Sequence, residues 1–317
     1  MAEITIRELA EACGVSIGTV SKALRHSERI SEATVRRIEE KARELGYVGN
    51  RAASALSAKR RTIGVFLPDA PEEIAARYRV GIRSAAPVLS AFGIDLTERT
   101  PEDGTDGLAA VLATASFLPR LRLPEDLPVA TVGRARDLHP VVEALPDYRI
   151  GGRLAAQFLA FATGGGSTAV LSARRTAYAE EESIRGFREL SHRLGTPPAA
   201  IVECGDGTRG VRTEVRRLLA ANPRLRGIFV TAPLVGAVAA AMADLRKKPL
   251  LVGLDFTKAA TDALRAGDAA ALLYTAPERL AERALLGLAA HLTGAAADAT
   301  LTLRTELVLK SNLESYL

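Results

Sequence analysis

The stretch Thr5–Tyr47 decides the fold: TIRELAEACGVSIGTVSKALRHSERISEATVRRIEEKARELGY. Its first residue and Glu8 have the spacing of a capping box, which predicts a helix that begins near Ile6. Gly14 ends this helix, because glycine tolerates the left-handed backbone conformation that a tight turn needs. The segment therefore opens with one short helix followed by a glycine turn.

Two more helix starts follow this turn. Ser16 is a good N-cap residue and predicts a second helix over about residues 17–24, and Ser31 does the same for a third helix. The third helix carries apolar residues at the helical period and then a glycine stop signal. The apolar stripe consists of Val35, Ile38, Ala42 and Leu45, and the stop signal is Gly46.

Two short helices joined by a glycine turn and braced by a third helix are typical of a helix-turn-helix module. The second helix of such a module enters the major groove of duplex DNA. Ile17 is suited to a thymine methyl group and Lys22 to guanine acceptors, while Ser21 can bond to either base. Ser16 and Thr19 are suited to phosphates. The predicted head contacts are Thr5, Ser16, Ile17, Gly18, Thr19, Ser21, Lys22 and Arg25. Spacing alone leaves open a small helical bundle without a DNA role.

The distribution of charge also points to DNA. Residues 1–61 hold twelve Lys and Arg and eight Asp and Glu, so twelve minus eight gives +4 of the chain's net +5. A basic end on a nearly neutral body indicates a polyanionic partner at that end.

Composition excludes several other classes of protein. The 317 residues exceed one compact domain, no apolar run is long enough to cross a membrane, and the N-terminus does not read as a signal peptide. We therefore expect a cytoplasmic protein without a membrane partner. Cys13 and Cys204 cannot form a disulfide framework, and the four histidines lack metal-ligand spacing. Enzyme motifs of the GxSxG, Walker A and HExxH types are absent, so no cofactor and no catalysis are expected.

Residues 50–61 are predicted to be a hinge between this head and a larger core. Gly and Pro are absent from this segment, and residues 51–58 suit a short helix that is marginal unless something packs against it. Its alanines let two copies approach closely, and Leu56 is a candidate wedge for the minor groove. The predicted hinge contacts with DNA are Asn50, Arg51, Ala53 and Leu56. A featureless basic linker with Leu56 packed on the core is the alternative.

The remaining sequence, residues 62–317, alternates apolar runs with amphipathic stretches. This alternation predicts an α/β core of doubly wound parallel sheets, covered on both faces. The glycine run Gly164–Gly166 marks an expected boundary between two lobes, with an N-lobe of about 62–160 plus 276–300 and a C-lobe of about 161–275 plus the C-terminal end. The predicted strands are 62–67, 93–96, 108–113, 128–133, 167–172, 200–204, 227–230, 250–255, 270–274 and 301–309.

The sequence of Thr5–Asp69 closely resembles that of the head and hinge of the lac repressor/gal repressor family. The core GVSxxTVSxxL, the ELGY ending of the third helix and the IG…PD entry into the core all occur in order. The resemblance continues to the final RTELVLKSNL. It implies a helix-turn-helix head (1–49), paired hinge helices whose Leu56 opens a base step, and a two-lobed periplasmic-binding-protein-like core crossed three times by the chain. Because one head offers few base contacts, we also expect two heads on a two-fold symmetric site, that is, a homodimer on a palindromic duplex operator.

The family's effector site is poorly preserved in this chain. Ser183 stands where the family usually has an arginine, Ala232-Pro233 replaces an Asn-Asp pair, and Thr275 replaces a glutamine. With aromatics at only 4%, a platform for stacking sugars is poorly supplied. The predicted effector contacts are Asp255, Arg134, Ser183, Arg185 and Tyr274. The alternatives are an N-cap role for Asp255, surface positions for the two arginines and a core position for Tyr274.

Three functions follow from these features. The first is a transcriptional repressor whose operator affinity is changed by a small-molecule effector of unknown identity. The second is an effector-independent or protein-controlled regulator of the same fold. The third, a solute-binding protein or a sugar enzyme on the same core fold, would have no use for residues 5–61.

The wedge hypothesis makes a prediction about Leu56→Ala. The substitution should leave folding intact and weaken binding to the specific operator far more than binding to nonspecific duplex, because only the specific complex needs an opened base step. Titrations of the two duplexes at one salt concentration measure both affinities. An equal loss for both would exclude the wedge.

Overall fold

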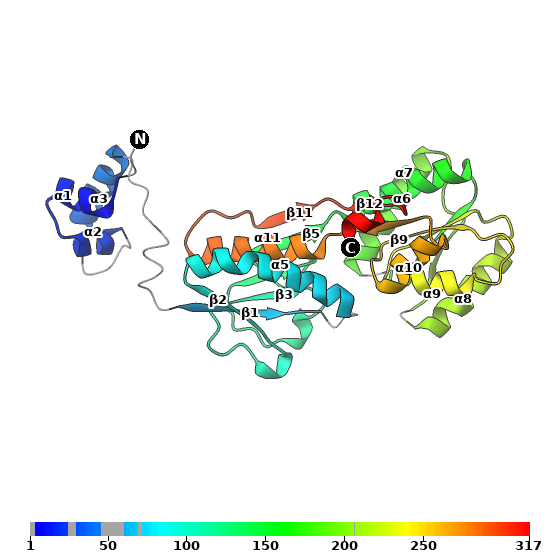
Figure 1. Cartoon of the computed structure of the whole chain (residues 1–317), viewed down its shortest axis with the longest axis horizontal. Helices are drawn as coiled ribbons and strands as arrows, with labels where there is room; N and C mark the ends of the chain where they lie inside the picture. The colour runs from blue at the N-terminus through cyan, green and yellow to red at the C-terminus, as the bar shows by residue number, and fades with distance from the viewer. Residues whose placement is uncertain (1–3, 25–29, 46–59, 69–71, 176, 206) are drawn as a thin grey trace. The chain divides into compact units, whose positions relative to one another are not determined.

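The computed structural model describes residues 4–24, 30–45, 60–68, 72–175, 177–205 and 207–317. The chain forms two compact units, one of residues 1–59 with 91–93 and one of residues 60–90 with 94–317. The first contains the head, and the second is the core (Figure 1). Several sequence predictions fall outside the described residues: the helix stop Gly46 and the DNA contacts Arg25, Asn50, Arg51, Ala53 and Leu56.

The head consists of α1 (Ile6–Cys13), α2 (Ile17–Ala23) and α3 (Glu32–Glu44). The capping box is confirmed, since the Thr5 side chain accepts from the backbone N–H of Glu8 and the Glu8 carboxylate accepts from the backbone N–H of Thr5. Gly14 has φ 63° and ψ 33°, the left-handed conformation that the turn needs. Ser16 and Ser31 cap α2 and α3 through their side chains.

One apolar cluster holds these three helices together. Leu9, Val20 and Ile38, one from each helix, are completely buried, and the predicted stripe of α3 packs into the same cluster. Burial of a large aliphatic side chain contributes about 2 kcal/mol, so this small cluster accounts for most of the head's cohesion.

The N-lobe of the core is built on a six-stranded sheet in the order β11-β5-β4-β3-β1-β2, with every pair parallel. Its strands are β1 (Arg61–Phe66), β2 (Ile94–Glu98), β3 (Ala110–Thr114), β4 (Val129–Val132), β5 (Val142–Pro146) and β11 (Thr300–Leu303). The sequence did not predict β5, whose apolar run is interrupted by Glu143 and ends at a proline.

The two faces of this sheet are covered differently. Helices α5 (Glu72–Ala91) and α11 (Pro277–Leu292) lie side by side over one face (Figure 1). The opposite face is covered by leucine-rich loops and the short 3-10 turn η2 (Leu118–Arg120), which close over Phe66. Loops thus replace the helices expected on that face.

The C-lobe has a second six-stranded sheet in the order β12-β10-β9-β8-β6-β7, parallel except for β12 at its edge. Its strands are β6 (Thr168–Ser172), β7 (Ala200–Glu203), β8 (Gly227–Val230), β9 (Leu250–Gly253), β10 (Ala271–Tyr274) and β12 (Glu306–Val308). The predicted doubly wound α/β architecture is confirmed.

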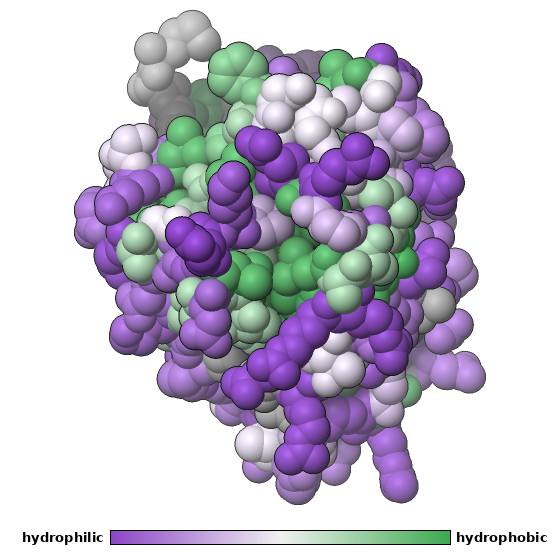
Figure 2. Space-filling view, turned by 90° about the vertical axis from the view of Figure 1, so that its right-hand side faces the viewer, coloured by the Kyte–Doolittle hydropathy of each residue, from purple (hydrophilic) through white to green (hydrophobic). Residues whose placement is uncertain are grey.

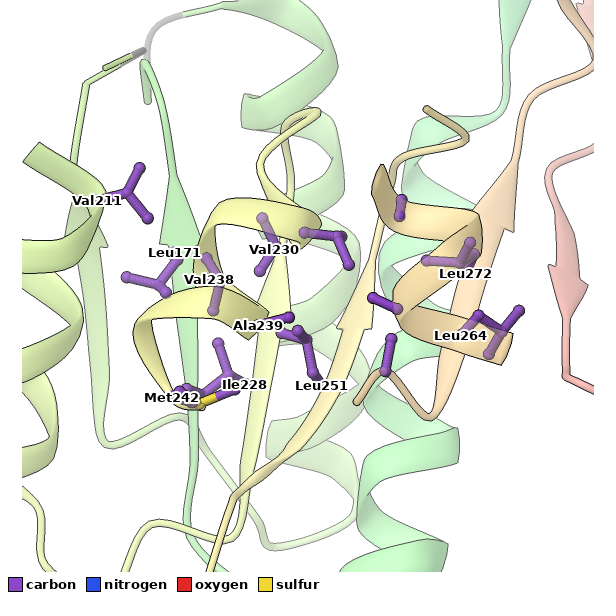
Figure 3. Packing of buried hydrophobic residues seen from close by; sticks show 14 of the residues in the cluster. Leu171, Val211, Ile228, Val230, Val238, Ala239, Met242, Leu251, Leu264 and Leu272 are labelled. Atoms are coloured by element: carbon purple, nitrogen blue, oxygen red, sulfur yellow. The ribbon is translucent and has the colours of Figure 1, made fainter. Parts of the chain in front are cut away.

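Helices cover both faces of this second sheet. On one face lie α6 (Tyr148–Thr163) and α7 (Tyr178–Arg193), and on the other α8 (Thr208–Ala221), α9 (Val235–Ala241) and α10 (Lys258–Ala266). Figure 3 shows the second layer, where side chains of α8, α9 and α10 pack against the strands. The turn η3 (Leu313–Tyr316) ends the chain, and no helix in the described residues is long and apolar enough to span a bilayer.

The chain crosses between the lobes three times. The first crossing lies between β5 and α6, because α6 packs on the C-lobe sheet; the run Gly164–Gly166 only ends α6 and does not separate the lobes as predicted. The second crossing lies between β10 and α11. The third divides the single strand predicted over 301–309 into β11 and β12, one in each sheet.

Two glycines allow α6 and α7 to pack in close contact. A Cβ atom added at Gly152 would lie 2.0 Å from the carbonyl oxygen of Ser183, and one added at Gly186 would lie 2.0 Å from that of Arg149. At both points the neighbouring atom is a backbone carbonyl oxygen, which cannot move aside to make room for an added Cβ as a flexible side chain could. Under this crossing, Phe187 stacks on Phe229 with ring centroids 5.3 Å apart.

Gly186→Ala should therefore destabilise the core by about 2 kcal/mol, since the added methyl group forces the helices apart. Urea unfolding followed by circular dichroism measures this loss. Gly207→Ala is the matched control, because a Cβ at that position meets nothing within 4 Å. Equal stability of Gly186→Ala and the wild type would contradict the described packing.

Candidate nucleic-acid interface and interlobe site

Helix α2 presents a polar and partly apolar face to solvent. Its N-cap Ser16 accepts a hydrogen bond from Thr19 N at 3.1 Å, and the two hydroxyl groups lie 2.9 Å apart. Val20 and Ala23 are buried and fix the inner side of the helix. Ile17 (41% exposed), Gly18 and Lys22 lie on the outer side, as the sequence predicts for groove-facing residues, while Ser21 is half-buried.

The turn between α1 and α2 has a support that sequence analysis missed. Arg37 of α3 donates to the carbonyl oxygen of Cys13 at 3.3 Å. A cation at a helix C-terminus also suits the helix dipole. Arg37 thereby connects α3 to the C-terminal end of α1, next to the N-terminal end of α2, the helix that is predicted to contact the bases.

Asp255 follows β9 by two residues and is buried. Its Oδ2 accepts from Val235 N at 3.1 Å and its Oδ1 from Thr257 N at 2.8 Å. Burial raises the pKa of this carboxyl, and the hydrogen bonds, those of Thr257 foremost, act in the opposite direction. The N-cap of α10 is Thr257, so Asp255 joins the starts of two helices and does not cap α10 itself.

Ser183 and Arg185 both lie on α7 but in different surroundings. Ser183 is completely buried and donates to the carbonyl oxygen of Ala179 at 2.7 Å. Arg185 is exposed and pairs with Glu181 at 3.4 Å and Glu182 at 2.9 Å in its own helix. These contacts match the surface alternative for Arg185.

Arg134 follows β4 and reaches both lobes. Its guanidinium group pairs with the buried carboxylate of Glu143 at 2.7 Å and lies 5.3 Å from the centre of the Tyr178 ring in the C-lobe. Nearby, Arg136 pairs with Glu181 at 3.1 Å, again across the lobes. Two cations of the N-lobe thus face α7.

Tyr274 belongs to a second contact between the lobes. Its hydroxyl donates to Glu278 at 2.6 Å and accepts from Arg77 of α5 at 2.9 Å. Arg77 also donates to the carbonyl oxygen of Tyr316 at 2.8 Å, and its guanidinium group lies over the Phe256 and Tyr274 rings. Burial is the main cause that raises the pKa of Tyr274.

Tyrosines gather at this junction. Tyr148 and Tyr178 meet edge to face at 6.2 Å, and burial raises the pKa of Tyr148. Burial together with nearby Glu278 raises the pKa of Tyr78 to about 12. Although aromatic residues make up only 4% of the chain, tyrosines are concentrated where the lobes meet.

A buried carboxylate was also missed. Glu180 in the first turn of α7 accepts from Ser172 Oγ, from Arg174 N at 3.0 Å and from Thr231 Oγ1 at 3.2 Å. Burial raises its pKa, and these hydrogen bonds act in the opposite direction. It lies at the carboxyl ends of β6 and β8. The sequence offers only a run of three glutamates, and helical phase alone separates this one from its partly exposed neighbours.

Family models match both parts of the chain. The model of bacterial regulatory proteins of the lacI family matches residues 5–50, and that of a periplasmic binding protein domain matches residues 138–296, half of the chain.

Relatives and solved structures extend this match. The maltose regulon regulatory protein MalI of Escherichia coli (strain K12) is 27% identical over 243 residues, 71% of this chain and 71% of MalI. The HTH-type transcriptional regulator CelR of Thermobifida fusca is 28% identical over 258 residues, 74% of this chain and 75% of CelR. A solved transcriptional regulator CelR–cellobiose complex has a TM-score of 0.66 at 21% identity, covering 97% of this chain and 99% of that one.

A helix-turn-helix head on a periplasmic-binding-protein-like core defines a DNA-binding transcriptional regulator, which is also what the named relatives are. The chain combines a helix-turn-helix domain of the lacI family of bacterial regulatory proteins with a periplasmic binding protein domain.

The buried Glu180 predicts a pH dependence of stability. Its folded pKa is raised above 4.5, so the stability of the wild type falls as pH rises from about 4.5 through the folded pKa. Glu180→Gln does not titrate. The difference in unfolding free energy between variant and wild type should therefore move in the variant's favour between pH 4 and 8, as urea unfolding at several pH values measures.

Glu189→Gln provides a control of opposite sign. Arg149 and Arg153 lower the pKa of Glu189 to about 2, so the wild type gains stability as pH rises through this lower range. That variant should lose stability relative to the wild type between about pH 2 and 5. A difference independent of pH for Glu180→Gln would contradict the described burial.

Proposed function

We propose that the protein is a repressor that binds a palindromic operator as a homodimer, with an affinity set by a small molecule held between its lobes. The observation that carries this proposal is the outer face of α2, where Ile17, Gly18 and Lys22 are exposed on a capped helix whose other side is buried. One short helix offers few base contacts, so specificity needs two heads on a two-fold symmetric site.

Each head contact has a proposed role. Ile17 and Lys22 read base edges in the major groove, Ser21 supports them, and Ser16 and Thr19 hold phosphates at the start of the helix. Thr5 and Arg25 add contacts at the flanks. Residues Asn50, Arg51, Ala53 and Leu56 of the hinge act in the minor groove.

The effector is proposed to bind where the lobes meet. Asp255, Arg134 and Tyr274 lie at strand ends, the place at which doubly wound sheets bind ligands. Ser183 and Arg185 are proposed as further effector contacts, although the buried Ser183 would have to become accessible. The solved CelR complex contains cellobiose, and a polar small molecule suits the tyrosines and cations of this junction.

Coupling between effector and DNA follows from the three crossings of the chain. A ligand that prefers one lobe arrangement shifts the equilibrium between arrangements. The N-lobe strand β1 continues from the hinge, so movement of this lobe changes the geometry at which two hinges meet. Hinges that cannot pair release the operator. A cytoplasmic location belongs to the same proposal.

One observation favours an effector-independent regulator as a second candidate. The lobes already bond to each other directly, through Arg136–Glu181, through Arg77 and through Glu73, which accepts from Lys258 N at 3.1 Å. Such contacts hold the core closed without a ligand. Thermal unfolding with candidate ligands separates the two functions, because a specific ligand stabilises the fold by mass action.

Selection from a random duplex pool with the full-length protein tests the main proposal. We expect an enriched palindrome of two half-sites around a deformable pyrimidine–purine centre. Lys22→Ala should weaken binding to the enriched site by about 1–3 kcal/mol and relax the preference at one position of each half-site. Enrichment of one half-site alone, or none, would contradict paired heads.

A further inference from the structure

A second basic surface lies on the core. The twenty residues 207–226, which form α8 and the following loop, contain six arginines and one acid, so six minus one gives +5. This local charge equals the net charge of the whole chain. The six arginines are Arg209, Arg212, Arg216, Arg217, Arg224 and Arg226.

Helical phase places three of them in one row. Val211, Val215 and Leu218 are buried against the C-lobe sheet, so the opposite side of α8 faces solvent. Residues 209, 212 and 216 are spaced by three and four positions on that exposed side. This row, called here the arginine comb, is about 10 Å long at 1.5 Å per residue, about three base-pair rises of duplex DNA.

The charge of this surface is little neutralised. Several arginines elsewhere on the core have carboxylate partners, such as Arg79 with Glu98 and Arg265 with Glu314. On α8, Arg217 pairs with Glu214 at 3.0 Å. Within the part of the chain that the structure describes, no ion pair is formed by Arg212, Arg216, Arg224 or Arg226.

A hollow extends this surface beyond the end of α8. It has a volume of about 1020 Å³, and Arg224, Arg226, Lys247 and Lys248 contribute cations to its lining. Figure 2 looks onto this end of the core, where hydrophilic side chains surround a smaller apolar area. Lys248 pairs with Asp268 at 2.7 Å at the rim.

The surface lies at the opposite end of the core from the entry of the hinge. Arg226 and Ser167 precede β8 and β6, so the hollow is at the amino ends of the C-lobe strands. Arg61 begins β1 at the amino end of an N-lobe strand. Because the carboxyl ends of both sheets meet at the lobe junction, these two amino ends point away from each other (Figure 1).

We propose that the arginine comb, with Arg224 and Arg226, binds the phosphate backbone of a second DNA duplex without reading its sequence. Guanidinium groups suit phosphates because their forked donors can bond in pairs. Unneutralised cations release counterions on binding, which supplies most nonspecific affinity for DNA. A regulator that binds an operator through its heads would then join two DNA segments, the second of them held by this surface of its core. This activity goes beyond the proposed function.

A bridging assay tests this proposal. A duplex that carries the sequence enriched by selection is tethered to beads and loaded with the full-length protein, and a fluorescent duplex without that sequence is added. We expect retention of the fluorescent duplex at 50 mM salt. With about four phosphate contacts, its affinity should fall roughly hundredfold by 200 mM.

The decisive variant is the triple substitution Arg212→Glu, Arg216→Glu and Arg224→Glu. It should lower retention of the second duplex at least tenfold while the protein remains on the tethered duplex with unchanged affinity. The matched control reverses three exposed arginines elsewhere on the core, Arg122→Glu, Arg188→Glu and Arg304→Glu, and should behave as the wild type. Circular dichroism and thermal unfolding of both variants confirm that they fold.

Each outcome has one meaning. Equal retention by the two triple variants overturns the proposal. So does retention of a labelled poly-glutamate peptide in preference to the duplex, which would assign the hollow to an acidic polypeptide. Retention of the protein on the beads is measured separately, so a failure of the heads to bind operator is distinguished from a failure of the comb.

Discussion

The parallel arrangement of the strands is the constraint on which the core depends. Parallel strands end at a common edge, and the carboxyl ends of both sheets meet where the lobes face each other. Polar groups at this junction are buried and must find partners. Glu180 accepts hydrogen bonds at the carboxyl ends of two strands, β6 and β8, and Asp255 joins the starts of two helices. The contacts that bind the lobes to each other, through Arg77 and Arg136, occupy the same edge.

Local signals made the head predictable. A capping box, a glycine with positive φ and two serine N-caps each act within a few residues, and all appear in the structure as predicted. The α/β class of the core was equally accessible, since buried strands read as continuous apolar runs. Family resemblance added the three crossings of the chain, which periodicity alone does not give.

Features set by distant partners were not predictable. Glu143 interrupted the apolar run of β5 in the sequence, and its ion pair with Arg134 and its hydrogen bond from Ala135 N explain a carboxylate within a buried strand. The division of 301–309 between two sheets depends on which neighbours each half finds, not on its own pattern. Glu180 and the tyrosines other than Tyr274 at the lobe junction were missed for the same reason. The roles of Asp255, Arg134, Ser183, Arg185 and Tyr274 toward a ligand stay predictions.

The position of β11 has a consequence for the order of folding during synthesis. This edge strand of the N-lobe sheet comes from residues 300–303, although the sheet begins with β1 at residue 61. The N-lobe sheet therefore cannot be completed until almost the entire chain has been synthesised. The strands β6 to β10 of the C-lobe follow one another in the sequence and can pair earlier. Such long-range pairing gives a high contact order, and slow folding with exposed strand edges is its usual result.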